Sequence, residues 1–500
     1  MSYRVRDALI KLLTPDIDCQ DRWEPKPGRH LSSLLDDLPI ELRLEIFRFS
    51  TYVPNAITIS PLDPFLPDRP NINVLGQNTP VLSMKTKCRL VSVSKAWRKT
   101  ALPLLYEHLV ITSPRRATMM LGALCREADN GTILRGHCTK HIQIFTHARG
   151  SESMQFLQTL FKIFRACPNL RILSGTWNRQ PPAEFTQAIV QMYGPSLQSL
   201  YWDNAHASQF TRMNVFEFFS SFSTLRTLDL RELHYEPENT ALPLSRPALP
   251  KIVELIVSSD KACLHVASTF RMPQLSRLTV VSKGRYTFNV QALNAFLMKH
   301  GQNLTTVNLL PHRLEDLPSA HCVPPAPFLQ PDVCPVLDSL SFHISADPIL
   351  PDTLEATPHY SLRRVALQGI KSHLLHPEPP SELSVWPGAL STKAHLFSLK
   401  KASFPALEIV RMPGFILDSD LEGSVKGTPL SASDLVYWWT DRFANEDVIL
   451  VDGSGTMWWL EDEEELGTQQ QIPVQTVTTM INAARKQTST LDSSAFPMGV

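Results

Sequence analysis

A short pattern of leucines recurs along most of the chain from about residue 137. Each copy has leucine or isoleucine first, leucine or valine at the fourth position, and in most copies an apolar residue at the sixth. Successive copies start 27, 28, 27, 23, 29, 33, 25 and 45 residues apart. The nine starting residues are Leu170, Leu197, Leu225, Ile252, Leu275, Leu304, Leu337, Leu362 and Leu407. One pattern, repeated at a near-constant period, predicts one structural unit repeated in space.

Helical periodicity fills the stretches between these copies, as in Glu152 to Arg165, Glu184 to Tyr193 and Val290 to Lys299. A short strand followed by a returning helix every ~20–29 residues is typical of leucine-rich repeats. The sequence therefore predicts an α/β chain with an irregular leucine-rich-repeat solenoid over residues 137–412, and Lys140 to Ile144 as an opening strand or cap. A doubly wound α/β domain is the alternative, although its strands would be longer continuous apolar runs.

Variable side chains beside the strand leucines are expected to point to the concave face of such a solenoid, because side chains alternate along a strand. Repeat proteins commonly bind partners on that face. Arginine and aromatic residues are favoured interface anchors, so Tyr201, Arg231 and His343 are the candidate target-binding residues. The alternative is that these are solvated strand residues. The other residues expected there are Asp203, Asp229, Glu254, Arg277, Asn308, Arg364 and Arg411.

Two proline-rich gaps, after Leu304 and after Leu362, are expected to be loops off one rim. Val448 to Val451 and Met457 to Leu460 flank an Asp-Gly/Ser-Gly turn, which predicts a hairpin in a C-terminal cap over residues 413–465. An aromatic ligand site is the alternative for this tryptophan-rich segment. Residues 1–30 are expected to be a flexible leader, and residues 466–500, rich in Gln, Thr and Ser, a mobile tail.

A second apolar pattern lies ahead of the repeats. Leu38, Leu42, Ile46 and Phe49 recur at near-helical spacing, and Pro39 suits the first turn of a helix. The second half, from Arg89 to Leu109, predicts a helix with apolar anchors at Leu90, Val91, Val93 and Trp97, and the chain from Leu102 to Leu109 then turns out of that helix. Between them, residues 51–87 are rich in proline and are expected to form a surface loop.

These two halves resemble an F-box, the docking domain of a ubiquitin-ligase subunit. The resemblance rests on Leu38-Pro39, on Ile46-Phe47, on Leu90-Val91 with Trp97-Arg98, and on the segment from Ala101 to Leu109, which is similar to that of fungal, basidiomycete-type F-box proteins. The insert 51–87 departs from the usual uninterrupted F-box, over a predicted domain of residues 31–112. The resemblance implies binding to the Skp-type adaptor of a cullin–RING ligase through Leu38, Pro39, Ile40, Leu42, Ile46, Phe47, Leu90, Val91 and Trp97. A helical core without a docking role is the alternative for the same residues.

Composition narrows the function further. The chain of 500 residues carries 48 basic and 48 acidic residues, so its charge gives no reason to expect nucleic acid or a membrane as partner. Lys11 interrupts the N-terminal apolar residues, and the eight cysteines are scattered without a C-x-x-C pair, which favours a cytoplasmic or nuclear protein with free thiols.

The sequence contains no recognised catalytic or phosphate-binding motif, and we expect neither a cofactor nor a metal. His137-Cys138 and His141 offer three metal ligands, but no matching pair lies nearby. The leading hypothesis is a non-catalytic substrate-recognition subunit of an SCF-type ubiquitin ligase. A scaffold built on leucine-rich repeats outside any ligase is the second hypothesis, and an enzyme with an unrecognised site is the third.

Overall fold

The computed structural model describes residues 38–53, 59–66, 79–125, 135–204, 215–233, 247–283, 289–311, 322–344, 357–375, 389–415 and 432–457. Within these residues, twelve parallel strands form one sheet in which every strand pairs with the next strand in sequence. The strands are β1 (His108–Ile111), β2 (His141–Phe145), β3 (Ile172–Thr176), β4 (Ser199–Asp203), β5 (Thr227–Asp229), β6 (Glu254–Ser258), β7 (Arg277–Val281), β8 (Thr306–Leu310), β9 (Ser339–His343), β10 (Arg364–Gln368), β11 (Ile409–Arg411) and β12 (Ile449–Val451).

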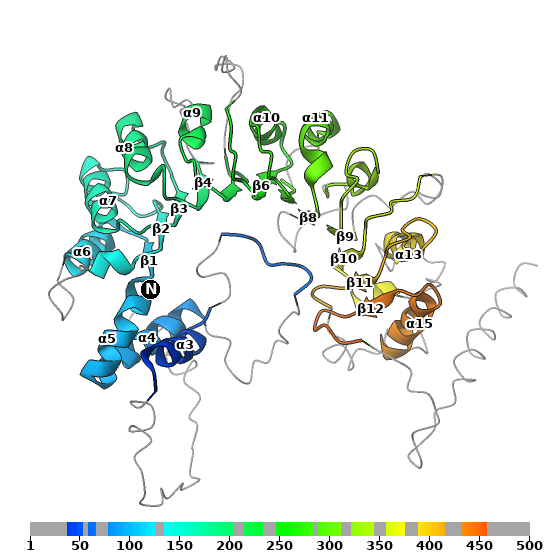
Figure 1. Cartoon of the computed structure of the whole chain (residues 1–500), viewed down its shortest axis with the longest axis horizontal. Helices are drawn as coiled ribbons and strands as arrows, with labels where there is room; N and C mark the ends of the chain where they lie inside the picture. The colour runs from blue at the N-terminus through cyan, green and yellow to red at the C-terminus, as the bar shows by residue number, and fades with distance from the viewer. Residues whose placement is uncertain are drawn as a thin grey trace, which may run out of the picture.

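The sheet follows the inner side of an arc, and the helices of the repeats cover its outer side (Figure 1). Helices on one face and strands in sequential order define a solenoid, so the prediction of a repeat array is confirmed and the doubly wound alternative is wrong. The outer elements are α6 (Pro114–Leu124), η1 (Arg135–Cys138), α7 (Met154–Ala166), α8 (Ala183–Tyr193), α9 (Val215–Ser220), α10 (Lys261–Thr269), α11 (Val290–His300), η3 (Gly301–Asn303), η5 (Ala326–Leu329), η6 (Ser372–Leu375), α13 (Ala389–Ser398) and α15 (Ala432–Ala444).

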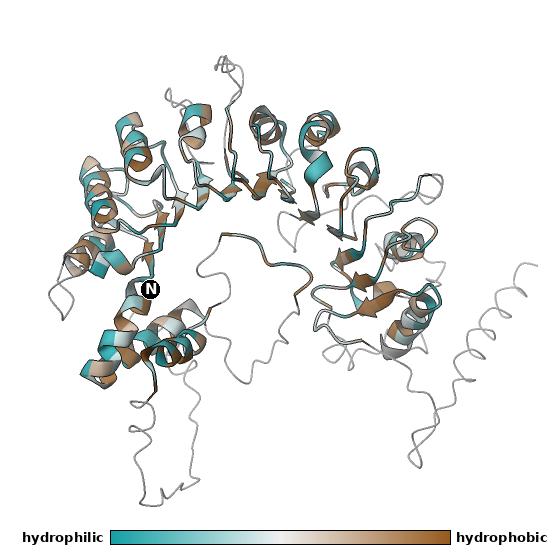
Figure 2. Ribbon diagram, in the orientation of Figure 1, coloured by the Kyte–Doolittle hydropathy of each residue, from teal (hydrophilic) through white to brown (hydrophobic). Residues whose placement is uncertain are grey.

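The nine leucine patterns build the core. Their fourth positions stand opposite one another in the register of successive strands, as Leu173 with Leu200 and Leu255 with Leu278. The first and fourth positions of all nine copies are at most 1% exposed. Burying one such side chain is worth ~1.5–3 kcal/mol, and each leucine contacts the next repeat as well as its own. Strands and inner helix faces are accordingly apolar (Figure 2).

Polar caps start several helices where the chain leaves the sheet. The side chain of Ser153 accepts a hydrogen bond from the backbone N–H of Phe156 at the start of α7. Asp260 caps α10 in the same way, through the N–H of Cys263. A cap satisfies backbone donors that lack a partner in the first turn, and so it fixes where the helix begins.

The sheet starts earlier than the sequence predicts. Residues 108–111 belong to the predicted F-box-like domain of residues 31–112, yet they form β1, which pairs with β2. Leu109 and Ile111 are buried beneath α6, and this alternation of side chains suits a strand. The predicted opening strand, Lys140 to Ile144, is therefore the second strand of the sheet.

The C-terminal hairpin is only partly present in the described residues. Ile449–Val451 joins β11 as a parallel twelfth strand, and a single antiparallel bridge links Val451 to Met457. Leu435 to Trp439, next to the predicted hairpin, lies on α15, and Trp439 is 1% exposed. The leader 1–30, residues 458–465 of the predicted cap and the tail 466–500 lie outside the described residues.

One proline-rich gap is also more ordered than a rim loop. Residues 326–329, in the gap after Leu304, form the short helix η5 and bury Phe328 and Leu329 against the core. η5 occupies the position of a repeat helix between β8 and β9. Proline suits the start of this single turn, because its missing N–H would have no partner there.

Three helices precede the sheet: α3 (Ile40–Ser50), α4 (Pro80–Val93) and α5 (Lys95–Tyr106). The predicted single helix from Arg89 is two helices, because Ser94 adopts an extended backbone and caps α5 through the N–H of Trp97. α4 begins at Pro80, so the last residues of the insert 51–87 are helical and not a loop. Residues 59–66 of the same insert lie on the concave side of the arc (Figure 1).

Candidate functional site

The two halves of the F-box-like pattern come together in space. Phe47 of α3 is 3% exposed, and its ring lies 4.9 Å from that of Trp97 on α5. Ala101 and Leu104 complete this small core, and Leu44, Leu90 and Val91 pack around it. Phe47 therefore supports the cluster from inside, and Leu90, Val91 and Trp97 are half-buried at its edge.

Four large apolar side chains of α3 are exposed, and three of them, Leu42, Ile46 and Phe49, share one face of the helix. Ile40, Leu42 and Ile46 are 46%, 52% and 43% exposed, and Phe49 is 78% exposed. Pro39 is exposed and Leu38 is half-buried just ahead of them. Exposed apolar patches of this kind commonly mark binding sites.

A dense set of hydrogen bonds joins this helical cluster to the sheet. The carbonyl of Glu107 accepts hydrogen bonds from the backbone N–H groups of Lys140 and His141, at 2.9 and 3.0 Å. The Glu107 carboxylate pairs with the Lys140 ammonium at 2.6 Å, and the Thr139 hydroxyl donates to the Tyr106 carbonyl at 3.0 Å. Helix α5 thus continues into β1 through residues that are fixed on both sides.

Two of the three predicted target-binding residues lie together on the concave face. The Arg231 guanidinium lies 5.8 Å from the centre of the Tyr201 ring. Arg231 also donates to the carboxylate of Asp229, with Nε and Nη2 at 2.9 and 2.6 Å from Oδ2. Asp229 is 0% exposed, so the pair holds Arg231 against the sheet with its outer edge accessible.

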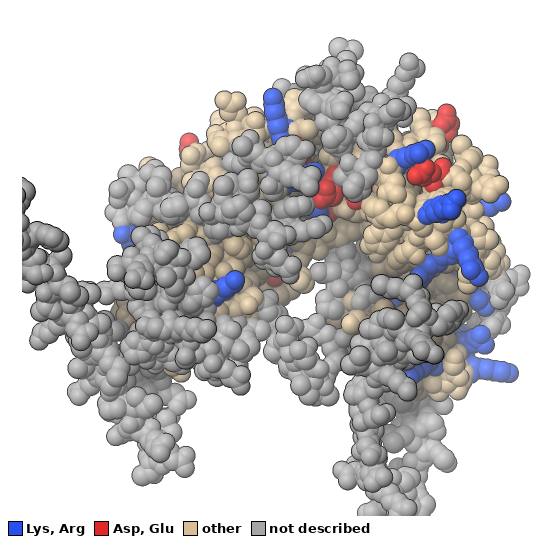
Figure 3. Space-filling view, turned by 180° about the vertical axis from the view of Figure 1, so that it is seen from behind, with Lys and Arg blue, Asp and Glu red and all other residues tan. Residues whose placement is uncertain are grey.

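A hollow of about 860 Å³ lies between α4 and the first five strands, and this Tyr201–Arg231 pair forms part of its wall. Its lining is rich in cationic side chains: Lys85, Lys87, Arg116 and Arg231. The single carboxylate that lines it, among the described residues, is Asp229, which Arg231 already neutralises. Lys and Arg also predominate on the side of the molecule with the N-terminal helices and first repeats (Figure 3).

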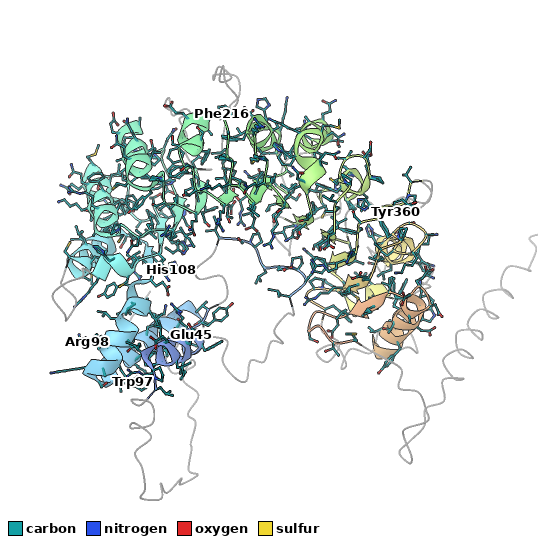
Figure 4. The ribbon with its side chains drawn as sticks, viewed as in Figure 1. Glu45, Trp97, Arg98, His108, Phe216 and Tyr360 are labelled. Carbon is teal, nitrogen blue, oxygen red and sulfur yellow. The ribbon has the colours of Figure 1, made fainter. Side chains whose placement is uncertain are left out.

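His108 and His141 occupy the floor of this hollow, at equivalent positions of β1 and β2. Their rings are stacked, with centres 4.3 Å apart, and His141 Nε2 lies 2.9 Å from the Ser174 hydroxyl. His108 is labelled in Figure 4, where it lies at the junction of the helices and the sheet. Burial, together with the nearby Lys87 ammonium, lowers the pKa of His108 to about 4, so its ring is neutral at pH 7.

The sequence pattern did not single out Lys87 or His108. The available signal was the histidine at the first strand position of two consecutive repeats, but His108 was assigned to the end of the F-box-like domain and not to a strand. Burial also lowers the pKa of Lys87, which lies within the last part of the insert. The hollow therefore depends on a contact between the N-terminal helices and the repeats that no local pattern encodes.

His343, the third predicted target-binding residue, lies on β9, well along the sheet from Tyr201 and Arg231. It is half-buried beside Gly369, whose φ of +80° places a left-handed turn directly against the imidazole. Burial, with Lys371 nearby, lowers the pKa of His343. The structure thus brings two of the three residues into one site and leaves the third apart.

Several other residues expected on the concave face have structural roles. Arg411 is 3% exposed, and its Nη2 donates to the Gly453 carbonyl at 2.6 Å. Asp203 and Asn308 are also buried, at 8% and 5% exposure. Arg364 donates to Asp338 of the neighbouring repeat but keeps one side accessible.

No group of three or more metal-ligating side chains is positioned to hold an ion in the part of the chain that the structure describes. His141, from the predicted trio with His137 and Cys138, stacks on His108 instead. None of the described helices combines the length and hydropathy needed to cross a bilayer.

The geometry defines a class of molecule: a one-sided parallel solenoid with a helical cluster fixed to its N-terminal end. No family model matches the sequence, and no curated protein matches it. A similar solved structure is that of the Rad7 and Elc1 complex in yeast, with 14% identity and a TM-score of 0.30 over 66% of this chain and 83% of that one. Similarity at this level leaves the function to be inferred from the residues described above.

Proposed function

We propose that the chain is a substrate-recognition subunit of an SCF-type cullin–RING ubiquitin ligase. Helices α3, α4 and α5 would bind a Skp-type adaptor, and the solenoid would bind a target protein. One observation carries the proposal: the two halves of the F-box-like pattern close into a single core through Phe47 and Trp97, while Ile40, Leu42 and Ile46 stay exposed on α3.

The exposed residues of α3 fit the role of adaptor contacts. Side chains of Ile40, Leu42 and Ile46 are each more than 40% exposed, and apolar helix faces commonly dock into hydrophobic grooves. Phe47 and Trp97 would position that face from inside the cluster. The chain would catalyse nothing itself; it would raise the concentration of the target near the charged ubiquitin carrier.

Co-purification of the full chain with a Skp-type adaptor tests the proposal. We expect the unsubstituted chain to retain the adaptor, and the triple variant Ile40→Ala, Leu42→Ala, Ile46→Ala to lose it. Exposed substitutions of this kind change stability by only ~0.5 kcal/mol each, so the triple variant should remain folded. Leu62→Ala is the matched control, because Leu62 is an exposed apolar residue outside the helical cluster.

Failure of the unsubstituted chain to bind the adaptor would reject the ligase role and favour a scaffold that uses its repeats alone. Retention of the adaptor by the triple variant, with unchanged melting temperature, would show that α3 is not the contact. Binding of a target protein in the absence of adaptor would not distinguish the two hypotheses.

A further inference from the structure

Part of the proline-rich insert lies across the concave face of the solenoid. Residues 59–66 cross the interior of the arc, and Ile59 lines the cationic hollow described above (Figure 1). Ser60, Pro61, Pro64 and Phe65 are half-buried, whereas Leu62 and Leu66 are 65% and 60% exposed. One side of this segment therefore contacts the sheet and the other side faces solvent.

Two side-chain contacts anchor the segment at its ends. The Ser60 hydroxyl donates a hydrogen bond to the carboxylate of Glu254 on β6. The Phe65 ring lies under the guanidinium of Arg364 on β10, 4.8 Å from its central carbon to the ring centre. Arg364 is itself held by hydrogen bonds to Asp338 and Ser339, at 3.2 and 2.9 Å, so its flat face is already oriented toward the ring.

The backbone between these anchors is shaped by its own sequence. Asp63 accepts a hydrogen bond from the N–H of Leu66 at 3.1 Å, and its side chain accepts one from the N–H of Phe65 at 2.9 Å. Asp at the first position and Pro64 at the second are preferred in such a turn. The turn presents Phe65 to Arg364.

The reach of the segment shows that it runs across the strands. β6 and β10 are four strand steps apart, or about 19 Å at ~4.8 Å for each step. The five residue steps from Ser60 to Phe65 span at most about 17 Å when extended. The Glu254 and Arg364 side chains close the remaining distance. A peptide in this position contacts one side chain, Glu254 or Arg364, in each of two well-separated repeats.

We propose that the concave face between β6 and β10 is a binding site for a short peptide segment of a target protein. The peptide carries a hydroxyl side chain for Glu254 and an aromatic ring five positions later for Arg364, and residues 60–65 occupy this site in the free chain. That the peptide belongs to a target protein rests on the proposed function. Binding of the peptide does not require the adaptor.

The exposure of three of the seven side chains from Ser60 to Leu66 suits an occupant that can be displaced. Leu62, Asp63 and Leu66 are exposed, so these three side chains contribute little to holding the segment against the sheet. A tethered segment competes through its effective concentration, which is about 1 mM for a short flexible connection. With an intrinsic dissociation constant of about 100 μM for the same peptide, the tethered copy would weaken binding of an added peptide roughly tenfold.

A labelled synthetic peptide with the sequence of residues 58–67 tests the site by fluorescence anisotropy on the full chain. We expect it to bind the double variant Ser60→Ala, Phe65→Ala roughly tenfold more tightly than the unsubstituted chain, because the internal copy no longer competes. The variant Leu62→Ala is the matched control, and it should bind the peptide as the unsubstituted chain does, since Leu62 faces solvent.

Specificity is tested in the background of that double variant. Glu254→Ala and Arg364→Lys should each weaken peptide binding at least fivefold, and so should alanine in place of phenylalanine in the peptide itself. Lysine keeps the charge of Arg364 and removes the flat guanidinium that covers the ring. Melting temperatures within a few degrees of the parent show that each variant is folded.

Three outcomes would overturn the inference: equal peptide affinity for the unsubstituted chain and the double variant, no binding to the double variant, or affinity that does not respond to Glu254 and Arg364. Each would show that Glu254 and Arg364 do not form a peptide site from which residues 59–66 can be displaced. Adaptor co-purification from the same preparations separates the two proposals, because retained adaptor binding with a failed peptide assay rejects the peptide site alone.

Discussion

Replacing Arg231 by alanine is expected to destabilise the solenoid by about 3–5 kcal/mol at pH 7. The cost arises because Asp229, which is 0% exposed, loses the guanidinium that lies 2.6 Å from its carboxylate. A buried charge without a partner is far more expensive than the loss of a surface ion pair. Asp229→Ala should cost less, about 2 kcal/mol, because Arg231 is 31% exposed and its released guanidinium can reach water.

The double variant Asp229→Ala, Arg231→Ala should cost clearly less than the sum of the two single variants, with a coupling of more than about 1 kcal/mol. The two residues form one hydrogen-bonded unit, so removing both leaves no charge stranded in the interior. This comparison matters for function as well, because Arg231 is a candidate target contact. A loss of target binding in an Arg231 variant therefore indicates a direct contact only if it is larger than the loss of folded protein explains.

The dependence of this cost on pH has a definite sign. Burial raises the pKa of Asp229, and the guanidinium of Arg231 opposes that effect. In Arg231→Ala the opposing charge is gone, so the folded-state pKa of Asp229, which is already above the unfolded value of about 3.9, rises further. The folded state then binds a proton more readily than the unfolded state, and stability is recovered as the pH falls from 7 toward 4.

Urea denaturation followed by circular dichroism at pH 7 and pH 5 measures these costs, with m-values compared to check that the same transition is observed. The reasoning would be refuted by a larger cost for Asp229→Ala than for Arg231→Ala. It would also be refuted by strictly additive single variants, or by a cost of Arg231→Ala that grows toward pH 5.

Three further predictions concern packing and protonation. Gly369→Ala should lower the free energy of unfolding, measured by urea denaturation, by about 1–3 kcal/mol, because φ at Gly369 is +80° and a Cβ there would overlap the His343 imidazole. Gly122→Ala is the control and should not destabilise the protein, because Gly122 lies on a helix with open space around it. Trp439→Phe should cost about 1–2 kcal/mol, because the indole N–H donates to the Leu375 carbonyl at 2.6 Å; an unchanged stability would count against that hydrogen bond. Burial, with Lys299 nearby, lowers the pKa of His300 to about 4, below its unfolded value of about 6.5, so the unfolded state binds the extra proton. Stability should therefore fall by about 1–2 kcal/mol from pH 7 to pH 5, and His300→Gln should remove that part of the pH dependence; an unchanged slope in the variant would contradict the assignment.

Local patterns were sufficient for the repeats. The leucines of each copy are buried by the unit that contains them and by its neighbours, so the nine strands could be predicted from spacing alone. The first strand of the sheet could not be predicted in this way. β1 follows α5 after one residue, and its strand conformation depends on pairing with β2, across more than 25 intervening residues.

The candidate sites divide in the same way. Tyr201 and Arg231 were predictable, because alternation along a strand places them on the concave face. The hollow lined by Lys87 and His108 was not, since it depends on α4 lying against the first strands. The position of residues 59–66 was equally inaccessible, because the hydrogen bond from Ser60 joins residues 194 positions apart in the chain.

The junction at Glu107 fixes the orientation of the solenoid relative to the helical cluster. Because Glu107 is fixed by backbone hydrogen bonds to Lys140 and His141, α5 and β1 meet without a flexible linker. One residue inserted near the end of α5 would rotate everything downstream by about 100° and shift it by about 1.5 Å relative to the helical cluster. The orientation in which the arc presents a bound protein is therefore set by the phase of a single helix, and a change of one residue in length there would alter which surface of that protein faces the rest of an assembly.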